Sequence, residues 1–315
     1  MHACVDIGGT KLAVSLAQPG SRQLLHRRAE PTAKEGAPDA VARQILRLLG
    51  DACAEAGITL AAIRGVGVSS ASPFLMRDGM IEVATPNICG GLAGADRGLP
   101  NDWTSFPLEA PLRAHFGAGV PVRVENDAVA ALEAERRWGA LRGVDHCAYV
   151  TWSTGVGMGL CADGRVLRGK NGNAGHGGHT FSSGSYEDPL CGCGNVGDLE
   201  SLVSGTAMGR RFAGQGFHDA AALLQAARAG EPAAAAIVDE LCHILGRALY
   251  NVVALLDLQR ISLGGSVFWH HREHLLPRLQ AELARHLPAL TAGVELVPAG
   301  LQDKVGDYAA LALVD

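Results

Sequence analysis

DIGGTK, residues 6–11, lies between two apolar runs near the start of the chain and has the composition of a phosphate-binding turn. Its glycines let the backbone approach a phosphate closely, and the N–H groups and the Thr10 hydroxyl can donate to phosphate oxygens. Asp6 ends the preceding run and could hold Mg²⁺ through water, because Mg²⁺ keeps much of its hydration. A tight hairpin that needs glycine for its backbone conformation explains the same residues. The segment by itself leaves the two interpretations even.

Two further glycine turns occur at expected strand ends. The stretch Ser153-Thr154-Gly155-Val156-Gly157-Met158-Gly159 joins two expected strands and is a second candidate phosphate clamp, although a hairpin is again the simpler alternative. The stretch Leu263-Gly264-Gly265-Ser266-Val267 ends another strand and could lie against the flat face of a nucleoside. Neither a helix-opening G-x-G-x-x-G nor a Walker-type motif is present, so a nucleotide between two lobes is favoured over a dinucleotide. The candidate nucleotide-binding residues are Asp6, Gly8, Gly9, Thr10, Lys11, Ser153, Thr154, Gly155, Gly157, Gly264 and Gly265.

The segments around these turns alternate in the manner of an α/β protein. The expected strands are residues 4–7, 12–16, 24–28, 65–69, 120–124, 148–151, 157–161 and 260–263. The expected helices are residues 39–56, 128–138, 200–212, 232–258 and 274–287. Each half opens with strands and then adds helices, with the second half beginning at residue 120, so we expect a structural duplication.

Length and composition fit a globular protein of two domains or of one large bilobed unit. The 315 residues are 48% hydrophobic, and a net charge of −5 without an extended basic cluster argues against a nucleic-acid partner. We find no apolar run of membrane-spanning length and no signal-peptide pattern, and therefore expect a cytoplasmic protein without a membrane partner. In that reducing compartment the 8 cysteines should not form disulfides. Six of them are expected to pack in the core: Cys4, Cys53, Cys89, Cys147, Cys161 and Cys242.

The stretch Val124-Glu125-Asn126-Asp127 combines a strand end with the start of a helix. Transfer of a phosphoryl group to a hydroxyl needs a base that orients the hydroxyl and accepts its proton. Asp127 has the chemistry of such a base, and Asn126 could hydrogen-bond neighbouring hydroxyls. Capping of the helix by either side chain is common at such a position and is favoured on this motif alone.

Histidine and cysteine gather in one glycine-rich stretch. The segment Asn173-Ala174-Gly175-His176-Gly177-Gly178-His179 is followed by Cys191-Gly192-Cys193 and then by Asp198. Thiolate and imidazole are natural zinc ligands, and a carboxylate can complete a tetrahedron, so the candidate ligands are Cys191, Cys193, a nearby histidine and Asp198. A loop with two free thiols and no metal fits the spacing equally well.

Together and in this order, the motifs resemble the ROK family (repressors, open reading frames and kinases), specifically its bacterial sugar kinases. The resemblance spans essentially the whole chain. Residues 6–11 resemble the family's first phosphate loop, residues 153–159 its second, and residues 263–266 its adenosine segment. The resemblance implies that Asp127 is the catalytic base, that Thr85-Pro86-Asn87 contacts the sugar, and that His179, Cys191 and Cys193 bind zinc. The implied sugar-binding residues are Asn87, Asn126, Asp127, His176 and His179.

The resemblance also implies a two-lobed actin-like ATPase fold, built from duplicated ribonuclease-H-like α/β lobes with a cleft between them. The smaller lobe would be residues 1–118 with residues 306–315 returning to it, and the larger would be residues 119–305 with the zinc-type loop. The implied activity is ATP-dependent phosphorylation of a sugar hydroxyl, with O6 of glucose or a related hexose as acceptor and Mg²⁺ and a structural Zn²⁺ as cofactors. Family members often dimerise, which implies a homodimer. No DNA-binding domain like that of the family's repressors is expected ahead of Asp6.

Four departures from the family pattern concern the sugar pocket and the metal. His176 stands where the family usually has glutamate, and Asp198 where it has a third zinc cysteine. The stretch Ser70-Ala71-Ser72-Pro73 replaces Ala-Pro-Gly-Pro, and residues 90–102 lengthen the loop beside Asn87. These changes leave open whether the substrate is a plain hexose or a modified sugar, such as an amino sugar or a C7-cyclitol. A catalytically silent sensor is the other alternative, against which Asp127 and both phosphate loops argue.

Overall fold

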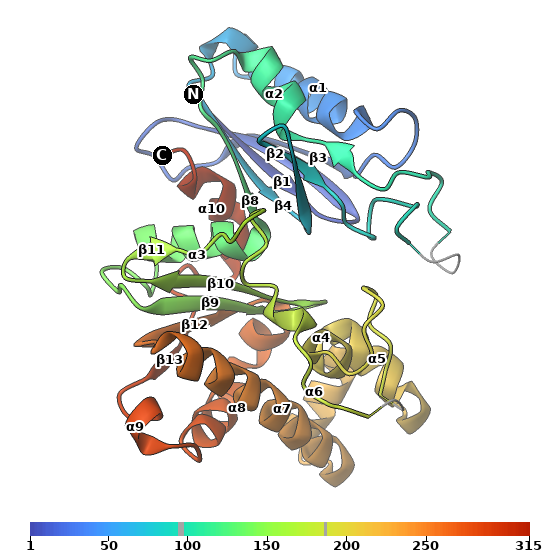
Figure 1. Ribbon diagram of the computed structural model, residues 1–315, viewed down its shortest axis with the longest axis vertical. Helices are drawn as coiled ribbons and strands as arrows, with labels where there is room; N and C mark the ends of the chain where they lie inside the picture. Colours follow the sequence, from blue (N-terminus) through green and yellow to red (C-terminus); the bar gives the residue numbers. More distant parts are fainter. Residues whose placement is uncertain (94–97, 186–187) are drawn as a thin grey trace. The chain divides into compact units, whose positions relative to one another are not determined.

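The computed structural model describes residues 1–93, 98–185 and 188–315, and the chain divides into two compact units (Figure 1). The first unit comprises Met1–Ala134, Arg168–Ala174 and Gly306–Asp315, and the second comprises Glu135–Leu167 and Gly175–Val305. Residues 119–134, which the sequence analysis assigned to the larger lobe, thus belong to the first unit. The reason is that their strand pairs with the sheet of that unit.

The first unit is built on a five-stranded mixed sheet with the order β3-β2-β1-β4-β8. Its strands are β1 (His2–Ile7), β2 (Lys11–Ala17), β3 (Leu25–Pro31), β4 (Gly65–Ser70) and β8 (Val122–Asn126). The hairpin β1–β2 is antiparallel, whereas β4 pairs parallel with β1 and β8 pairs parallel with β4. A smaller sheet of the same unit contains β5 (Phe74–Arg77), β6 (Met80–Val83) and β7 (Phe106–Pro107).

Helices cover both faces of this first sheet (Figure 1). The helical segments are α1 (Ala40–Glu55), η1 (Leu60–Ala62), α2 (Glu109–Phe116), α3 (Asp127–Trp138) and α10 (Val305–Ala312). α1 buries the predicted apolar face, Ile45, Leu48, Leu49 and Ala52, in the core against the sheet. α10 lies against β4 so closely that a Cβ added at Gly67 would come 1.9 Å from the Ala310 carbonyl oxygen.

The second unit repeats this topology. Its sheet has the order β11-β10-β9-β12-β13 and contains β9 (Cys147–Trp152), β10 (Val156–Ala162), β11 (Arg165–Val166), β12 (Arg260–Gly264) and β13 (Glu295–Pro298). As in the first sheet, two antiparallel pairings precede two parallel ones. The expected duplication is therefore confirmed, but its second half starts at β9. The strand expected at residues 120–124 is instead β8, the last strand of the first sheet, because it pairs with β4.

Helices of the second unit pack around this sheet and form a large apolar core. They are η3 (Gly177–His179), α4 (Leu199–Val203), α5 (Gly205–Phe212), η4 (Ala213–Gln215), α6 (Ala220–Arg228), α7 (Pro232–Leu256), α8 (Ser266–Leu283), α9 (Pro288–Thr291) and η5 (Gln302–Lys304). The single helix predicted at residues 200–212 is wrong, because Ser204 ends α4 and its side chain caps α5. The helix predicted at residues 274–287 begins earlier, at Ser266, and ends at Leu283.

The sequence predicts neither disulfides nor a membrane-spanning segment. All eight cysteines are free thiols, and the six that were expected in the core are buried. Within residues 1–93, 98–185 and 188–315, no helix has both the length and the apolar character needed to cross a bilayer.

Glu135, in the last turns of α3, is a fully buried carboxylate that organises part of the second unit. Its oxygens accept hydrogen bonds from the N–H groups of Ala140 (2.9 Å), Gly300 (2.9 Å) and Leu301 (2.8 Å), and from the Ser262 hydroxyl (3.0 Å). The side chain thereby joins α3 to β12 and to the loop after β13. Because buried polar groups without partners are costly, this carboxylate should contribute strongly to stability.

We predict that Glu135→Ala lowers the free energy of unfolding by about 3 kcal/mol or more, because three backbone N–H groups lose their acceptor. Urea denaturation followed by circular dichroism measures this difference. The matched control is Glu240→Ala, which removes a glutamate of the same unit whose side chain is 52% exposed. Equal midpoints for the two variants would contradict the role assigned to Glu135.

Candidate active site and metal centre

The first phosphate loop, Gly8–Lys11, connects β1 to β2 in the first unit and is fixed through its carbonyl groups. The Gly8 N–H donates to the Lys11 carbonyl (2.9 Å), and Thr32 donates its hydroxyl to the Gly8 carbonyl (2.7 Å) and its N–H to the Thr10 carbonyl (3.1 Å). In the described part of the chain, the N–H groups of Gly9 and Thr10 make no hydrogen bond. The loop therefore presents unpaired donors, which suits an anion.

Gly9 has a packing reason to be glycine. A Cβ at this position would lie 2.7 Å from the Cβ of Asn87, which is an impossible contact. The loop and Asn87, which is exposed, are thus adjacent in the first unit. The structure therefore brings together a predicted nucleotide-binding turn and a predicted sugar-binding residue.

Asp6 and Asp127 lie at the same edge of the first sheet. In the register, Asp6 is paired with Ser69 of β4 and Ser69 with Glu125 of β8, two residues before Asp127. Asp6 is accessible to solvent, yet the surrounding protein desolvates its carboxylate and the Asp127 charge adds to this effect, so its pKa is raised to about 6. Asp307 acts in the same direction, whereas Arg27 and Lys11 oppose the shift.

Asn126 caps α3, which was the alternative explanation of the Glu-Asn-Asp motif. Its Oδ1 accepts hydrogen bonds from the N–H groups of Ala128 (2.9 Å) and Val129 (3.3 Å), and its Nδ2 donates to the Ser72 hydroxyl (2.8 Å). The Asp127 side chain is exposed, and its Oδ1 accepts a hydrogen bond from the adjacent Ala128 N–H (2.8 Å). Asn126 thus holds the start of α3, and the Asp127 carboxylate faces solvent at that start.

Glu125, to which the sequence analysis gave no role, anchors a distant segment. It is buried on β8 and accepts a hydrogen bond from Arg168 Nε at 2.5 Å, while Arg168 also reaches Glu133 at 3.1 Å. A few residues on, the Asn173 amide donates to and accepts from the Phe74 backbone, both at 2.8 Å. These bonds fix residues 168–174 to the first unit. An acidic residue in an apolar strand was the available signal, but its partner could not be deduced.

The second phosphate loop and the glycine pair meet at one edge of the second sheet. Ser153, Thr154 and Gly155 connect β9 to β10, and Gly264 pairs with Thr151 at the ends of β12 and β9. The start of α5 lies on the loop, because the Gly205 N–H donates to the Ser153 carbonyl (2.8 Å) and the Thr206 N–H to the Thr154 carbonyl (3.3 Å). Ligands of α/β proteins commonly bind at the carboxyl ends of strands, where these turns lie.

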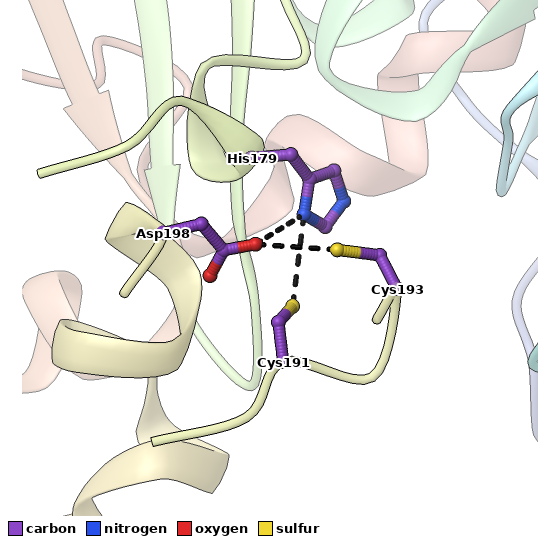
Figure 2. Close-up of side chains that lie close together, drawn as sticks. All are labelled: His179, Cys191, Cys193 and Asp198. Carbon is purple, nitrogen blue, oxygen red and sulfur yellow. Dashed lines mark hydrogen bonds and ion pairs between the residues drawn. The ribbon is translucent and has the colours of Figure 1, made fainter. Parts of the chain in front are cut away.

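Four candidate ligands converge in the second unit (Figure 2). One donor atom from each of His179, Cys191, Cys193 and Asp198 lies within 4.8 Å of the other three. Asp198 Oδ2 is 3.1 Å from His179 Nδ1 and 3.3 Å from Cys193 Sγ, and Cys191 Sγ is 3.7 Å from His179 Nδ1. We call these residues the metal cluster. The structure brings together all four residues that the sequence predicted.

The two carboxylate oxygens of Asp198 have different partners. It is fully buried, and its Oδ1 accepts a hydrogen bond from the Ser201 N–H (2.8 Å), which caps α4, while Oδ2 faces the cluster. Burial alone would raise the pKa of Asp198, but hydrogen bonds from His179, Ser201 and the two thiols lower it to about 2. A single ionised oxygen directed at two thiols and an imidazole is a suitable monodentate zinc ligand.

The glycines before His179 let its segment lie flat on β10. A Cβ at Gly178 would come 2.1 Å from the Val156 carbonyl oxygen, so no side chain fits there. The Met158 N–H donates to the Gly175 carbonyl at 3.1 Å and fixes the same segment. His176 is half-buried in this stretch, with its ring centroid 6.1 Å from that of His179.

The predicted sugar-binding residues are divided between the units. Asn87, Asn126 and Asp127 belong to the first, and His176 and His179 to the second. Of the lengthened loop at residues 90–102, residues 94–97 lie outside the described part of the chain. The rest is held by the Asn101 amide, which accepts from the Gly90 N–H (2.7 Å) and donates to the Lys34 carbonyl (2.8 Å).

Comparison with known proteins gives consistent results. Residues 2–315 match the ROK family. The chain is 35% identical to an N-acetylmannosamine kinase of Salmonella typhimurium over 268 residues, which are 84% of this chain and 82% of that protein. The crystal structure of a ROK hexokinase from Thermus thermophilus is 32% identical with a TM-score of 0.77, covering 99% of this chain and 97% of that one. A Streptomyces griseus ROK glucokinase, solved with glucose and AMPPNP, is 26% identical with a TM-score of 0.72, covering 99% and 98%.

With its two duplicated α/β units, the chain has the two-lobed actin-like ATPase fold of the ROK kinases, and the enzyme class that follows is ATP-dependent sugar kinase. The chain belongs to the ROK family.

Proposed function

We propose that this kinase transfers the γ-phosphoryl group of ATP to the O6 hydroxyl of an N-acetylated amino sugar such as N-acetylmannosamine. The observation that carries the proposal is the 35% identity to N-acetylmannosamine kinases over 84% of the chain. His176 supports it, because a neutral imidazole offers both a donor and an acceptor. A carboxylate at the same place could only accept.

A plain hexose is the second candidate acceptor. It is favoured by the 32% identity to a hexokinase and the 26% identity to a glucokinase over 99% of this chain. The two candidates share the reaction and the catalytic residues, and they differ in the substituent at the sugar ring.

Each candidate residue has a task in this reaction. Asp127 accepts the proton of the acceptor hydroxyl, and Asn126 fixes the start of α3 so that this carboxylate is held in place. The unpaired N–H groups of Gly9 and Thr10 donate to phosphate oxygens, as does the Ser153–Gly157 loop of the second unit. Gly264 and Gly265 contact the adenosine. The sugar is bound by Asn87, His176 and His179. ATP supplies the phosphoryl group, and Mg²⁺ neutralises its charge.

The attack position is tested with a deoxy analogue. N-acetylmannosamine should yield one ADP per sugar consumed, whereas its 6-deoxy analogue should yield none and should inhibit competitively. Turnover of the 6-deoxy compound would contradict phosphorylation at O6. A kcat/KM for glucose that exceeds the value for N-acetylmannosamine would favour the second candidate.

Asp6 fits the role of a carboxylate that binds hydrated Mg²⁺, since it is an oxygen ligand beside the unpaired donors of the first loop. With its pKa raised to about 6, Asp6 is ionised at neutral pH and becomes protonated as the pH falls through 6. Protons and Mg²⁺ then compete for it. We therefore predict that the Mg²⁺ concentration for half-maximal MgADP binding rises about fourfold between pH 7.5 and pH 5.5.

Calorimetric titration with ADP at a series of Mg²⁺ concentrations, at each of the two pH values, measures this change. The control is Asp6→Asn, which keeps the titration of the nucleotide itself but loses that of Asp6. The same pH dependence in both proteins would show that Asp6 takes no part.

The metal cluster fits zinc in ligand number, ligand type and proximity, and a bound zinc would cross-link the loop that carries His176. We predict one zinc per chain in protein purified without chelator. Asp198→Cys should bind it about tenfold more tightly, because thiolate is a softer ligand than carboxylate. Atomic emission and competition with a chromogenic chelator give the two quantities. Folded, active protein that contains no zinc would contradict the assignment.

A further inference from the structure

Thr32, the residue that follows β3, is buried beside the first phosphate loop although its side chain is polar. It is 5% exposed. Its hydroxyl donates to the Gly8 carbonyl at 2.7 Å, and its N–H donates to the Thr10 carbonyl at 3.1 Å. The sequence analysis did not single out this residue. Both bonds end on the backbone of the loop, so Thr32 acts on the conformation of the loop.

The hydroxyl bond fixes the orientation of the peptide between Gly8 and Gly9. A trans peptide is planar, and its C=O and N–H groups point in opposite directions. Because the Gly8 carbonyl points toward Thr32, the Gly9 N–H of the same peptide points away from Thr32. This N–H is one of the two loop donors that make no hydrogen bond within the described residues. Thr32 therefore sets the direction of a donor that it does not itself contact.

Glycine on both sides makes this peptide easy to rotate. Without a Cβ, Gly8 and Gly9 can adopt backbone conformations that other residues avoid. Rotation of the peptide by half a turn would put a carbonyl oxygen in the place of the Gly9 N–H, and that oxygen would repel an anion. The bond from the Gly8 N–H to the Lys11 carbonyl (2.9 Å) belongs to the preceding peptide and does not prevent this rotation. The Thr32 hydroxyl opposes it directly.

Thr32 is in turn held by α1. The Gln44 side chain, half-buried on this helix, donates from Nε2 to the Pro31 carbonyl (2.8 Å) and accepts at Oε1 from the Ala33 N–H (2.9 Å). The residues on both sides of Thr32 are thus bonded to one amide. Because α1 packs in the core of the first unit, the hydroxyl has a rigid support.

We propose that Thr32 is a positioning residue for the nucleotide, which acts by holding the Gly8–Gly9 peptide with its N–H directed at the phosphates. The inference rests on the proposed function of the first loop as a phosphate-binding site. A loop that is already oriented loses less conformational freedom when its ligand binds. Removal of the hydroxyl should therefore weaken nucleotide binding and leave sugar binding unchanged.

The test is Thr32→Val, which removes the hydroxyl and keeps the branched shape and the N–H bond to Thr10. The dissociation constant of MgADP, measured by calorimetry on the full chain, should rise about 5–10-fold, the effect of one lost hydrogen bond. The KM for ATP should rise similarly, whereas the KM for the sugar should change less than about twofold. Thr32→Ser keeps the hydroxyl and should stay within about twofold of the native protein.

Thr59→Val is the matched control, because Thr59 is an exposed threonine of the same unit whose side chain caps no helix. It should behave like the native protein. Gln44→Ala tests the support of Thr32 without changing Thr32 itself, and it should raise the KM for ATP about two- to fivefold.

Three results would overturn the proposal. They are equal MgADP affinities of the native protein and Thr32→Val, an equal loss of affinity in Thr32→Ser and Thr32→Val, and a raised sugar KM with an unchanged KM for ATP. If Thr32→Val does not fold, an unchanged KM for ATP in Gln44→Ala overturns it as well. Failure of the native protein to bind MgADP would contradict the proposed function itself.

Discussion

Replacement of Asp127 by asparagine is expected to lower kcat about 10²–10⁴-fold, the usual contribution of a general base. Asparagine keeps the size of the side chain but cannot accept the proton of the acceptor hydroxyl. The fold should be unaffected, because Asn126 accepts from two N–H groups of α3, and asparagine at position 127 keeps an oxygen that can accept from the Ala128 N–H. Steady-state kinetics measure kcat, and calorimetric titration with the sugar measures its affinity. The sugar affinity should stay within about threefold of the native value.

Loss of the Asp127 charge could lower kcat by changing the pKa of Asp6, without any role of Asp127 as a base. A variant that removes another charge near Asp6 serves as the control. Asp307, on α10, raises the pKa of Asp6 as Asp127 does, but it is not part of the Glu-Asn-Asp motif. Asp307→Asn should therefore leave kcat within a few-fold of the native value. A similar loss in both variants, or near-normal turnover of Asp127→Asn, would remove Asp127 as the base.

The second large effect is expected from His176→Glu. A buried polar group that loses its partner costs roughly 1–3 kcal/mol, enough to shift preference by about one to two powers of ten. Glutamate accepts hydrogen bonds only, whereas neutral histidine donates one and accepts one. The variant should therefore gain activity on glucose relative to N-acetylmannosamine, since it restores the residue that the family usually has. Values of kcat/KM over a panel of hexoses, amino sugars and cyclitols measure the change in ranking.

A packing role for His176 predicts a different result. Its ring lies 6.1 Å from that of the cluster residue His179, so a substitution could disturb the loop without changing the sugar pocket. In that case activity on all sugars should fall by one common factor. An unchanged ranking would exclude His176 from the sugar site.

The alternation of apolar strands, turns and helices was enough to predict the duplicated α/β architecture. Short edge elements such as β7, Phe106–Pro107, were not predicted, because two residues carry no periodic pattern. The break between α4 and α5 was missed because Ser204 is compatible with a helix, and only the bond from the Ala207 N–H identifies it as a cap. The origin of the second half was misplaced for a similar reason, because strand pairing is not visible in sequence.

In the candidate site, too, some features could be predicted from the sequence and others needed the structure. Residue types and spacing were sufficient to predict which four side chains come together as candidate metal ligands, because few residue types bind metals. The division of roles between Asn126 and Asp127 needed geometry, since either side chain can cap a helix. Arg168 bonds to Glu125, 43 residues away in the sequence, and no local pattern reveals such a pair.

A coupled assay of ADP release tests most directly whether the chain is a kinase whose acceptor is a sugar. Purified protein with MgATP should release ADP only when a sugar is added. In a panel of N-acetylated amino sugars, glucose, mannose and cyclitols, release should be fastest with N-acetylmannosamine. Asp127→Asn should release almost none. ADP release that is independent of added sugar, or absent with every sugar of the panel in folded, zinc-loaded protein, would contradict the account.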